Sequence, residues 1–236
     1  YEARLKLIEA YDRAGFYAYH VAEHHSTPLG MAPSPSVFLA AVAQRTRRLR
    51  FGPLVYALPL HHPLRLIEEI CMLDQMSGGR LEIGFGRGSS PAEIALYGED
   101  PAKAQRIYAE ALDLVLKGLS ERTLNFHGEF FTFDNVPMEL EPLQKPHPPV
   151  WYGVHSVESA ERAARRGLHV VSLDSARETR GFADRYREAW RETRGEIRGM
   201  PKIGISRFIV VADSDEEALG IARRAYPAWR RSFYHL

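Results

Sequence analysis

Apolar residues along the chain follow two spacings, one typical of strands and the other typical of helices. Short apolar runs bounded by glycine, proline or polar residues predict strands. Between these runs, apolar residues recur every three or four positions, as on the buried face of a helix. Six strands are predicted, at 17–22, 49–56, 81–86, 150–154, 169–173 and 203–211. Helices are predicted at 2–14, 37–45, 63–76, 101–119, 156–166, 177–193 and 215–231.

The strict alternation of strands and helices indicates a parallel α/β sheet. The first three predicted strands start at Tyr17, Leu49 and Leu81, and each step of 32 residues is about the size of one βαβ unit. That regularity favours a barrel or a doubly wound sheet. The helix at 2–14 has no strand before it, and closure at about eight strands needs a further unit after the last helix. The sequence thus predicts a (β/α)8 TIM barrel whose first and last strands are absent from this sequence.

A single barrel domain over residues 1–236 is therefore expected, with one insertion at about 120–149. Within the insertion, alternating phenylalanines at 126, 130, 131 and 133 precede the run Lys145-Pro-His-Pro-Pro149. This pattern predicts a short hairpin followed by an extended segment. No chemistry is assigned to it, because such aromatic side chains commonly fill a gap beside a core.

Charge and cysteine content narrow the classes of partner. Lysine and arginine number 31 against 30 aspartate and glutamate residues, a net charge of +1, which gives no broad cationic surface for nucleic acid or an anionic membrane. A lone cysteine, Cys71, can form no intramolecular disulfide, and no apolar run approaches the roughly 20 residues that span a bilayer. These features predict a cytoplasmic protein that acts on a small molecule.

Histidines follow two of the predicted strands, at the strand ends where barrel enzymes build their sites. In Ala22-Glu-His-His25 only one histidine can face the barrel mouth, because adjacent residues of an extended chain point opposite ways. Histidine moves protons near neutral pH, although a structural histidine bonded to backbone remains open. His61 and His62, just before Pro63, are interpreted as cap or lid residues. Leu58 and Phe85 hint at a hydrophobic substrate at the mouth.

Two further strand ends carry groups suited to a phosphate. Gly84-Phe-Gly-Arg-Gly-Ser-Ser90 lets the backbone approach a ligand closely and places the cation Arg87 among glycines. It fails as a dinucleotide fingerprint, since Ser89 stands where a third glycine is needed. Ser156 can cap a helix whose first N–H groups face an anion. A salt bridge of Arg87 at the barrel rim and an ordinary cap at Ser156 remain open.

Taken together, the motifs at the strand ends resemble those of the bacterial luciferase-like monooxygenase family, which includes alkanal monooxygenase. The resemblance covers nearly the whole chain and thins after His169. It rests on Ala22-Glu-His-His25, Leu58-Pro-Leu-His-His-Pro-Leu-Arg65, Leu73-Asp-Gln-Met-Ser-Gly-Gly-Arg-Leu-Glu-Ile-Gly-Phe-Gly-Arg-Gly88 and Pro148-Pro-Val-Trp-Tyr-Gly153.

The resemblance implies a flavin-dependent monooxygenase that uses reduced FMN, supplied by a separate flavin reductase, and O2. A C4a-hydroperoxyflavin would then oxidise a small hydrophobic substrate such as an aldehyde, so the cofactor supplies the difficult chemistry. His24 falls on the histidine near the flavin and would act as a base or stabilise the peroxide. Leu54 and Val55 fall at a bulge with a cis non-proline bond. The cofactor-binding residues implied are Leu54, Val55, Gly86, Arg87, Gly88, Ser89, His155, Ser156 and Ser159.

The chain departs from the light-emitting members at two positions. Gly86 stands where they have cysteine, and His155 stands where they have glutamate, so bioluminescence is not predicted. Family members usually dimerise, which implies a homodimer. The family's mobile loop over the active site is expected soon after residues 229–236.

Three other functions are considered. The first keeps the fold and uses the deazaflavin F420 for hydride transfer, without oxygen chemistry. The second is a metal-dependent hydrolase using His20, Glu23, His24 or His61, but no His-x-His strand motif or second carboxylate cluster is present, and no metal site is predicted. The third is a non-catalytic flavin-binding relative.

Overall fold

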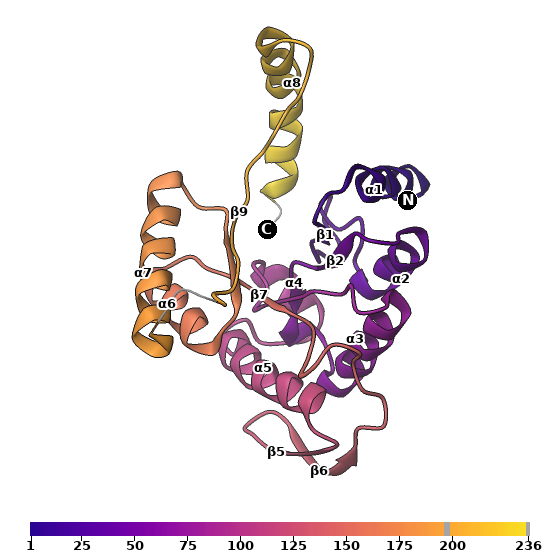
Figure 1. Ribbon diagram of the computed structural model, residues 1–236, viewed down its shortest axis with the longest axis vertical. Helices are drawn as coiled ribbons and strands as arrows, with labels where there is room; N and C mark the ends of the chain where they lie inside the picture. Colours follow the sequence, from indigo (N-terminus) through magenta and orange to yellow (C-terminus); the bar gives the residue numbers. More distant parts are fainter. Residues whose placement is uncertain (196–198, 235–236) are drawn as a thin grey trace. The chain divides into compact units, whose positions relative to one another are not determined.

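The computed structural model describes residues 1–195 and 199–234 (Figure 1). The chain divides into two compact units. Unit 1 comprises Tyr1–Glu23 and Ala32–Gly153, and unit 2 comprises His24–Met31 and Val154–Leu236. A single domain over residues 1–236 stays a prediction. Of the segment 229–236, near which a mobile loop is expected, residues 235 and 236 lie outside the described residues.

Unit 1 alternates strands and helices, as predicted. Its helices are α1 (Glu2–Ala14), α2 (Pro35–Arg45), η1 (Leu58–Leu60), α3 (Pro63–Ser77), α4 (Pro91–Leu96) and α5 (Ala104–Ser120). Its strands are β1 (Ala18–Val21), β2 (Arg50–Pro53), β3 (Tyr56–Ala57), β4 (Ile83–Gly86), β5 (Thr123–His127), β6 (Thr132–Pro137) and β7 (Val150–Gly153).

The strands between the helices of unit 1 pair in parallel, which confirms the α/β prediction. Strand β1 pairs with β2, with Ala18 opposite Arg50. Strand β4 lies between β3 and β7, with Tyr56 opposite Phe85. Because the strands are parallel, their carboxyl ends lie at the same edge, and the sequence motifs follow those ends.

The helices of unit 1 cover the strands with apolar faces. Helix α3 begins at Pro63, whose missing N–H costs nothing in the first turn, and it ends at Gly78 in a left-handed conformation (φ 65°). Its buried face includes Ile67 and Ile70, and α5 contributes Leu114 among other fully buried residues. The 3.6-residue spacing read from the sequence thus corresponds to the observed core.

The insertion forms the predicted hairpin. Strands β5 and β6 pair antiparallel, and Figure 1 shows this hairpin beside α5. The Glu110 carboxylate on α5 accepts N–H bonds from Glu129 (2.8 Å), Phe130 (2.9 Å) and Phe131 (2.8 Å) at the hairpin turn. One helix residue therefore holds the turn in place.

A buried carboxylate joins the strands of unit 1. Glu82 lies just before β4, and its side chain is fully buried. It accepts hydrogen bonds from the Tyr17 hydroxyl (2.5 Å), Arg50 Nε (2.8 Å) and Trp151 Nε1 (2.6 Å), and His20 Nε2 lies 3.5 Å away. Burial by itself would raise the pKa of the Glu82 carboxyl group, but these surrounding bonds lower its pKa to about 2.

Unit 2 contains α6 (Val157–Arg166), β8 (His169–Ser172), α7 (Ala176–Arg194), β9 (Ile203–Ile205) and α8 (Asp215–Phe233). Strands β8 and β9 pair in parallel, with Val170 opposite Ile203. Helices α6 and α7 lie side by side (Figure 1), and the small residues Ala160 and Ala164 let them approach closely. The Tyr186 hydroxyl donates to the Leu168 carbonyl at 2.6 Å, which ties α7 to the turn before β8.

Three element predictions need correction. The strand predicted at 203–211 ends at Ile205. Ser206 still donates its N–H to the Ser172 carbonyl at 2.8 Å, but residues 207–211 have no strand partner in the described part of the chain. The strand predicted at 49–56 is divided into β2 and β3. Helix α4 was not predicted, because its six residues are too few for a periodic pattern to appear.

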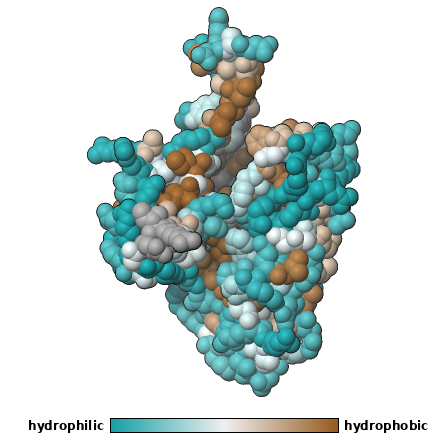
Figure 2. Space-filling view, viewed as in Figure 1, coloured by the Kyte–Doolittle hydropathy of each residue, from teal (hydrophilic) through white to brown (hydrophobic). Residues whose placement is uncertain are grey.

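The segment after β9 exposes apolar side chains. Phe208 is 73% exposed and Val211 is 86% exposed, and α8 contains no buried residue. Trp229 contacts Phe208 edge to face, with ring centroids 4.5 Å apart. Figure 2 shows apolar surface along this segment, at the top of the view.

No helix among the described residues is both long enough and apolar enough to cross a membrane.

The first prediction concerns Glu82. Glu82→Gln should lower the free energy of unfolding by about 3 kcal/mol, because it leaves Arg50 without its buried counter-charge. Tyr17→Phe, which removes one hydrogen bond to the same carboxylate, should cost only about 1 kcal/mol. Urea unfolding measures both changes. Equal effects of the two substitutions would contradict the central role of the charge.

The pH dependence of stability gives a second prediction. A carboxyl group whose pKa is lower in the folded state stabilises the fold above its unfolded pKa and loses that contribution as pH falls. The stabilisation by Glu82 should therefore disappear between about pH 4.5 and pH 2. Unfolding of the wild type and Glu82→Gln, measured across this range, should show the difference between them shrinking toward low pH. A constant difference would refute the assignment.

Candidate functional site

The segment between β2 and β3 carries the first predicted cofactor contacts. The peptide bond between Leu54 and Val55 is cis, as the family resemblance implies. The Leu54 N–H donates to the Val21 carbonyl at 2.8 Å, so this segment is fixed to the carboxyl end of β1. Leu54 and Val55 therefore lie at the carboxyl edge of the parallel strands.

Two glycines of β4 let this segment approach the strand closely. A Cβ atom on Gly86 would lie 2.5 Å from Val55 Cγ2, and one on Gly84 would lie 2.6 Å from the Pro53 carbonyl oxygen. A Cβ atom is almost never this close to an atom to which it is not bonded, so neither position can carry a side chain unless its neighbours move. Val55 thus occupies the space that a side chain at position 86 would take, where light-emitting members have cysteine.

Arg87 follows Gly86 and is exposed. Its Nε makes a long contact of 3.4 Å to the carbonyl of Gly88, which has a positive φ of 87°. Within residues 1–195 and 199–234 Arg87 forms no ion pair, so the rim salt bridge left open by the sequence is not observed. Ser89 is exposed beside it, and Ser90 caps α4. The loop therefore presents a guanidinium group that an anion can approach.

The buried Glu23 pairs with the half-buried His61, a contact that the sequence did not reveal. The Glu23 carboxylate lies 2.9 and 3.0 Å from His61 Nε2 and accepts the Ala57 N–H at 2.8 Å. His61 and His62 were interpreted as cap or lid residues, and they occupy the C-cap position of η1 and the N-cap position of α3, the latter without a side-chain capping bond. The pairing could not be found from spacing, because the two residues lie 38 positions apart.

The two adjacent histidines begin the part of unit 2 that lies early in the sequence. His25 is buried and His24 is half-buried. A Cβ atom on Gly30 would lie 2.4 Å from the His24 carbonyl oxygen, so the loop 24–31 folds back closely on the histidine backbone. His24, the predicted catalytic residue, keeps part of its surface accessible.

The start of α6 is a helix N-terminus capped by serine side chains. Ser156 Oγ accepts the Ser159 N–H at 3.1 Å, and Ser159 Oγ accepts N–H bonds from Ser156 (3.1 Å) and His155 (3.3 Å). Ser156 is therefore the helix cap, as predicted, and Ser159 completes a capping box. The pKa of Glu158 is lowered by its own backbone N–H and by the Ser156 hydroxyl, in keeping with a helix end that favours negative charge.

His155, just before this cap, pairs with Asp174. Its Nδ1 lies 3.0 Å from Asp174 Oδ2, and the same oxygen accepts the Ser172 hydroxyl at 2.7 Å. Burial by itself would raise the pKa of Asp174, but the bonds from Ser172 and His155 lower it below its usual range. Asp174 was not predicted from the sequence, although it lies two residues after the end of β8.

Other features carry less chemistry. Leu58 and Phe85, expected at the mouth, are fully buried, so they do not line an open mouth. Burial raises the pKa of the Cys71 thiol to about 12, which makes it unreactive. Among the described residues no group of three or more metal-ligating side chains occurs.

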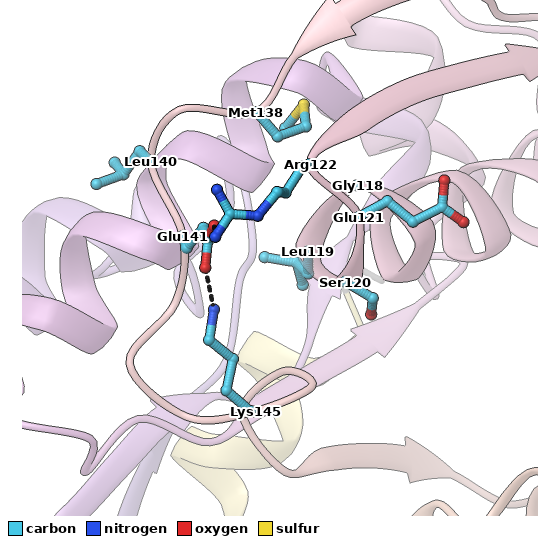
Figure 3. A pocket seen from close by; sticks show the side chains of 9 residues that line it. All are labelled: Gly118, Leu119, Ser120, Glu121, Arg122, Met138, Leu140, Glu141 and Lys145. Carbon is cyan, nitrogen blue, oxygen red and sulfur yellow. Dashed lines mark hydrogen bonds and ion pairs between the residues drawn. The ribbon is translucent and has the colours of Figure 1, made fainter.

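A surface pocket lies away from the predicted site residues of unit 1, at the end of α5 (Figure 3). Glu121, Arg122, Glu141 and Lys145 contribute its charged side chains, and Glu141 pairs with both cations. Figure 3 shows the Glu141 carboxylate directed toward Lys145. None of the predicted site residues lines this pocket.

The chain matches the family described as luciferase-like monooxygenase over residues 1–235, and it belongs to that family. An uncharacterised protein of Sinorhizobium fredii, y4wF, is 45% identical over 100% of this chain and 69% of its own length. The oxygenase component of a flavin-dependent trigonelline monooxygenase from Acinetobacter baylyi is 30% identical over 92% of this chain and 61% of its own length.

Solved structures give the same fold class. The monooxygenase RslO1 from Streptomyces bottropensis superposes with a TM-score of 0.93 at 29% identity, covering 99% of this chain and 72% of its own. The structural neighbours, which include F420-dependent enzymes at 18% and 20% identity, share the TIM-barrel fold. At such low identity the F420-dependent neighbours show the fold alone. The predicted fold class is thus confirmed.

The contact between Val55 and Gly86 gives a third prediction. Gly86→Ala should destabilise unit 1 by about 1–3 kcal/mol, because its Cβ meets a Val55 methyl group. Val55→Ala combined with Gly86→Ala should recover much of that loss in thermal unfolding. Gly181→Ala, in the open middle of α7, is the control and should be neutral or slightly stabilising. Additive losses in the double variant would show that the two residues do not share this space.

Proposed function

We propose that this chain belongs to a flavin-dependent monooxygenase that binds reduced FMN and uses O2 to oxidise a small, hydrophobic substrate. The observation that carries the proposal is the guanidinium group of Arg87, which is exposed and without an ion pair among the described residues. It follows β4 in a glycine-rich loop that is part of the motifs on which the resemblance to the family rests.

The donor set fits the FMN phosphate. A guanidinium group binds phosphate through charge-assisted hydrogen bonds. The N-terminus of α6 offers backbone N–H groups, and α6 is ten residues long. The Ser156 and Ser159 hydroxyls donate to the Glu158 carboxylate and to the Ser156 carbonyl in this structure, and they are proposed to turn toward the phosphate when it binds. Each group follows the carboxyl end of a parallel strand. These residues, with Gly88, Ser89 and His155, are proposed to hold the phosphate.

The flavin ring is proposed to lie against Leu54, Val55 and Gly86. The absence of a side chain at Gly86 leaves the Val55 methyl groups as the apolar surface there. A flat apolar ring system gains most from contact with such a surface. When bound, reduced flavin supplies the electrons that activate oxygen.

His24 is proposed as the catalytic residue that holds or transfers a proton. It is half-buried and follows the anchored residue Glu23, which is bonded to Ala57 and His61. An imidazole can accept or donate a proton, and it can also donate a hydrogen bond to a developing negative charge.

Several other features stay proposals. A separate flavin reductase would supply the reduced cofactor, and the protein is proposed to be a cytoplasmic homodimer. The substrate is proposed to be small and apolar because the residues expected at the flavin ring are apolar.

Cofactor binding provides a fourth prediction. FMN should bind to the protein under anaerobic reducing conditions, and Arg87→Ala should weaken that binding by about tenfold, equivalent to about 1.4 kcal/mol. The affinity for riboflavin, which lacks the phosphate, should change little. Arg122→Ala, at an exposed arginine of the pocket in Figure 3, is the matched control. Tight binding of F420 with no binding of FMN would retain the fold and overturn the function.

Turnover tests the role of His24. With a flavin reductase, NADH and candidate substrates, His24→Ala should lower the rate of product formation by about a hundredfold or more while FMN still binds. Oxygen consumption and peroxide release, measured together, report how much of the oxygen reaches substrate. FMN binding with no product from any substrate, unaffected by His24→Ala, would indicate a non-catalytic flavin-binding relative.

A further inference from the structure

His155 stands at the outer end of a chain of buried polar groups. The Asp174 carboxylate faces its Nδ1 at 3.0 Å and accepts the Ser172 hydroxyl at 2.7 Å. Thr179 Oγ1 donates to Ser172 Oγ at 3.2 Å and to the Asp174 carbonyl at 3.1 Å. Ser172 and Thr179 are buried, whereas the imidazole is 62% exposed. The interior groups therefore fix the carboxylate, and the carboxylate fixes the ring.

An ordinary surface pair in the same protein shows the contrast. His127 and Asp134 on the β5–β6 hairpin lie 3.0 Å apart, but their side chains are 67% and 64% exposed. Asp174 is only 25% exposed. Exposed ion pairs such as the one on the hairpin contribute little to stability, because water competes for hydrogen bonds with both partners. The pair in unit 2 is instead supported by buried hydroxyl groups from β8 and α7.

The carboxylate determines which protons the imidazole carries. A carboxylate accepts hydrogen bonds, so it favours a proton on Nδ1, and the second nitrogen, Nε2, remains available on the exposed ring. The protonated imidazole carries N–H groups on both nitrogens, one for Asp174 and the other for an external anion.

We propose that Asp174 is a positioning residue, and that it holds the His155 imidazole so that Nε2 contacts the phosphate monoester of the cofactor. The proposal rests on the proposed function, since His155 directly precedes the Ser156 cap assigned to that phosphate. An imidazolium held by a carboxylate gives a directed hydrogen bond at little conformational cost, because the ring is already oriented. A glutamate at this position, as in light-emitting members, could not supply it.

The test compares the affinities for FMN and riboflavin, measured anaerobically with the reduced forms. The wild type should prefer FMN, and His155→Gln should lower that preference by about tenfold, or about 1.4 kcal/mol. Asp174→Asn should lower it by a similar factor, and the two changes together should add nothing further. Ser172→Ala, which removes one support of the carboxylate, should lower it by about threefold. Asp134→Asn, in the hairpin pair, should leave the preference unchanged.

Imidazole nitrogen resonances provide a readout that a merely structural role would not move. The signals of His155 are identified as those missing from His155→Gln. In the neutral ring of the wild type, Nδ1 should carry the proton, and in Asp174→Asn the proton should move to Nε2, because the asparagine amide donates to Nδ1. Inorganic phosphate should perturb these signals in the wild type less than FMN does, if the site recognises a phosphate attached to flavin.

The outcomes separate the two proposals. A wild type that binds FMN no better than riboflavin overturns the phosphate assignment and this inference together. A clear preference for FMN that survives both His155→Gln and Asp174→Asn overturns this inference alone. Losses in Asp174→Asn that add to those in His155→Gln, with unchanged nitrogen resonances, also overturn it. If Asp174→Asn fails to fold, Ser172→Ala still tests the inference. An unchanged preference for FMN over riboflavin in Ser172→Ala would contradict the positioning role of Asp174.

Discussion

The buried carboxylate of Glu82 is the constraint on which the rest of unit 1 depends. It receives hydrogen bonds from groups next to β1, on β2 and on β7, while Glu82 itself leads into β4. A buried charge is costly unless it is fully paired, so strand placements that break these bonds are strongly disfavoured. The parallel register that results brings the carboxyl ends of β2 and β4 to one edge. Leu54, Val55 and Arg87 occupy that edge, so a structural interaction at one end of the strands positions candidate cofactor contacts at the other.

Close approach of β2 and its following segment to β4 requires glycine at particular positions. A Cβ atom on Gly52 would lie 1.8 Å from the Glu82 carbonyl oxygen, and Gly84 and Gly86 are crowded by residues 53–55. The same glycines leave Val55 as the apolar surface beside the proposed flavin ring. The groups proposed to bind phosphate are polar or charged and lie near solvent. The proposed site therefore takes its apolar contacts from residues next to the strands and its polar contacts from the loops that follow them.

Much of the fold was predictable because its determinants are local. Helical and extended spacings, the glycine after α3 and the capping serine before α6 each act within a few residues, and those elements were found within a few positions. The strand predicted to Val211 stopped at Ile205, because apolar composition indicates an extended run but does not provide a pairing partner. Helix α4 escaped prediction because six residues hold less than two full turns. At the site, cap and loop residues such as Ser156 and Arg87 were identified from their own neighbourhoods.

The sequence by itself determined the class of fold and the family, and it led to the residues proposed to bind a phosphate, because those signals lie in short contiguous motifs. Only the tertiary structure decided which side chains act on those residues. Glu23 meets His61 across 38 positions, and Asp174 meets His155 across 19. Neither pairing produces a periodic pattern in the sequence, because each carboxylate meets its partner only when segments after separate strands pack together. The types of chemical group present at each motif therefore follow from the sequence alone. The orientation and charge of those groups depend on contacts that form only when the chain folds.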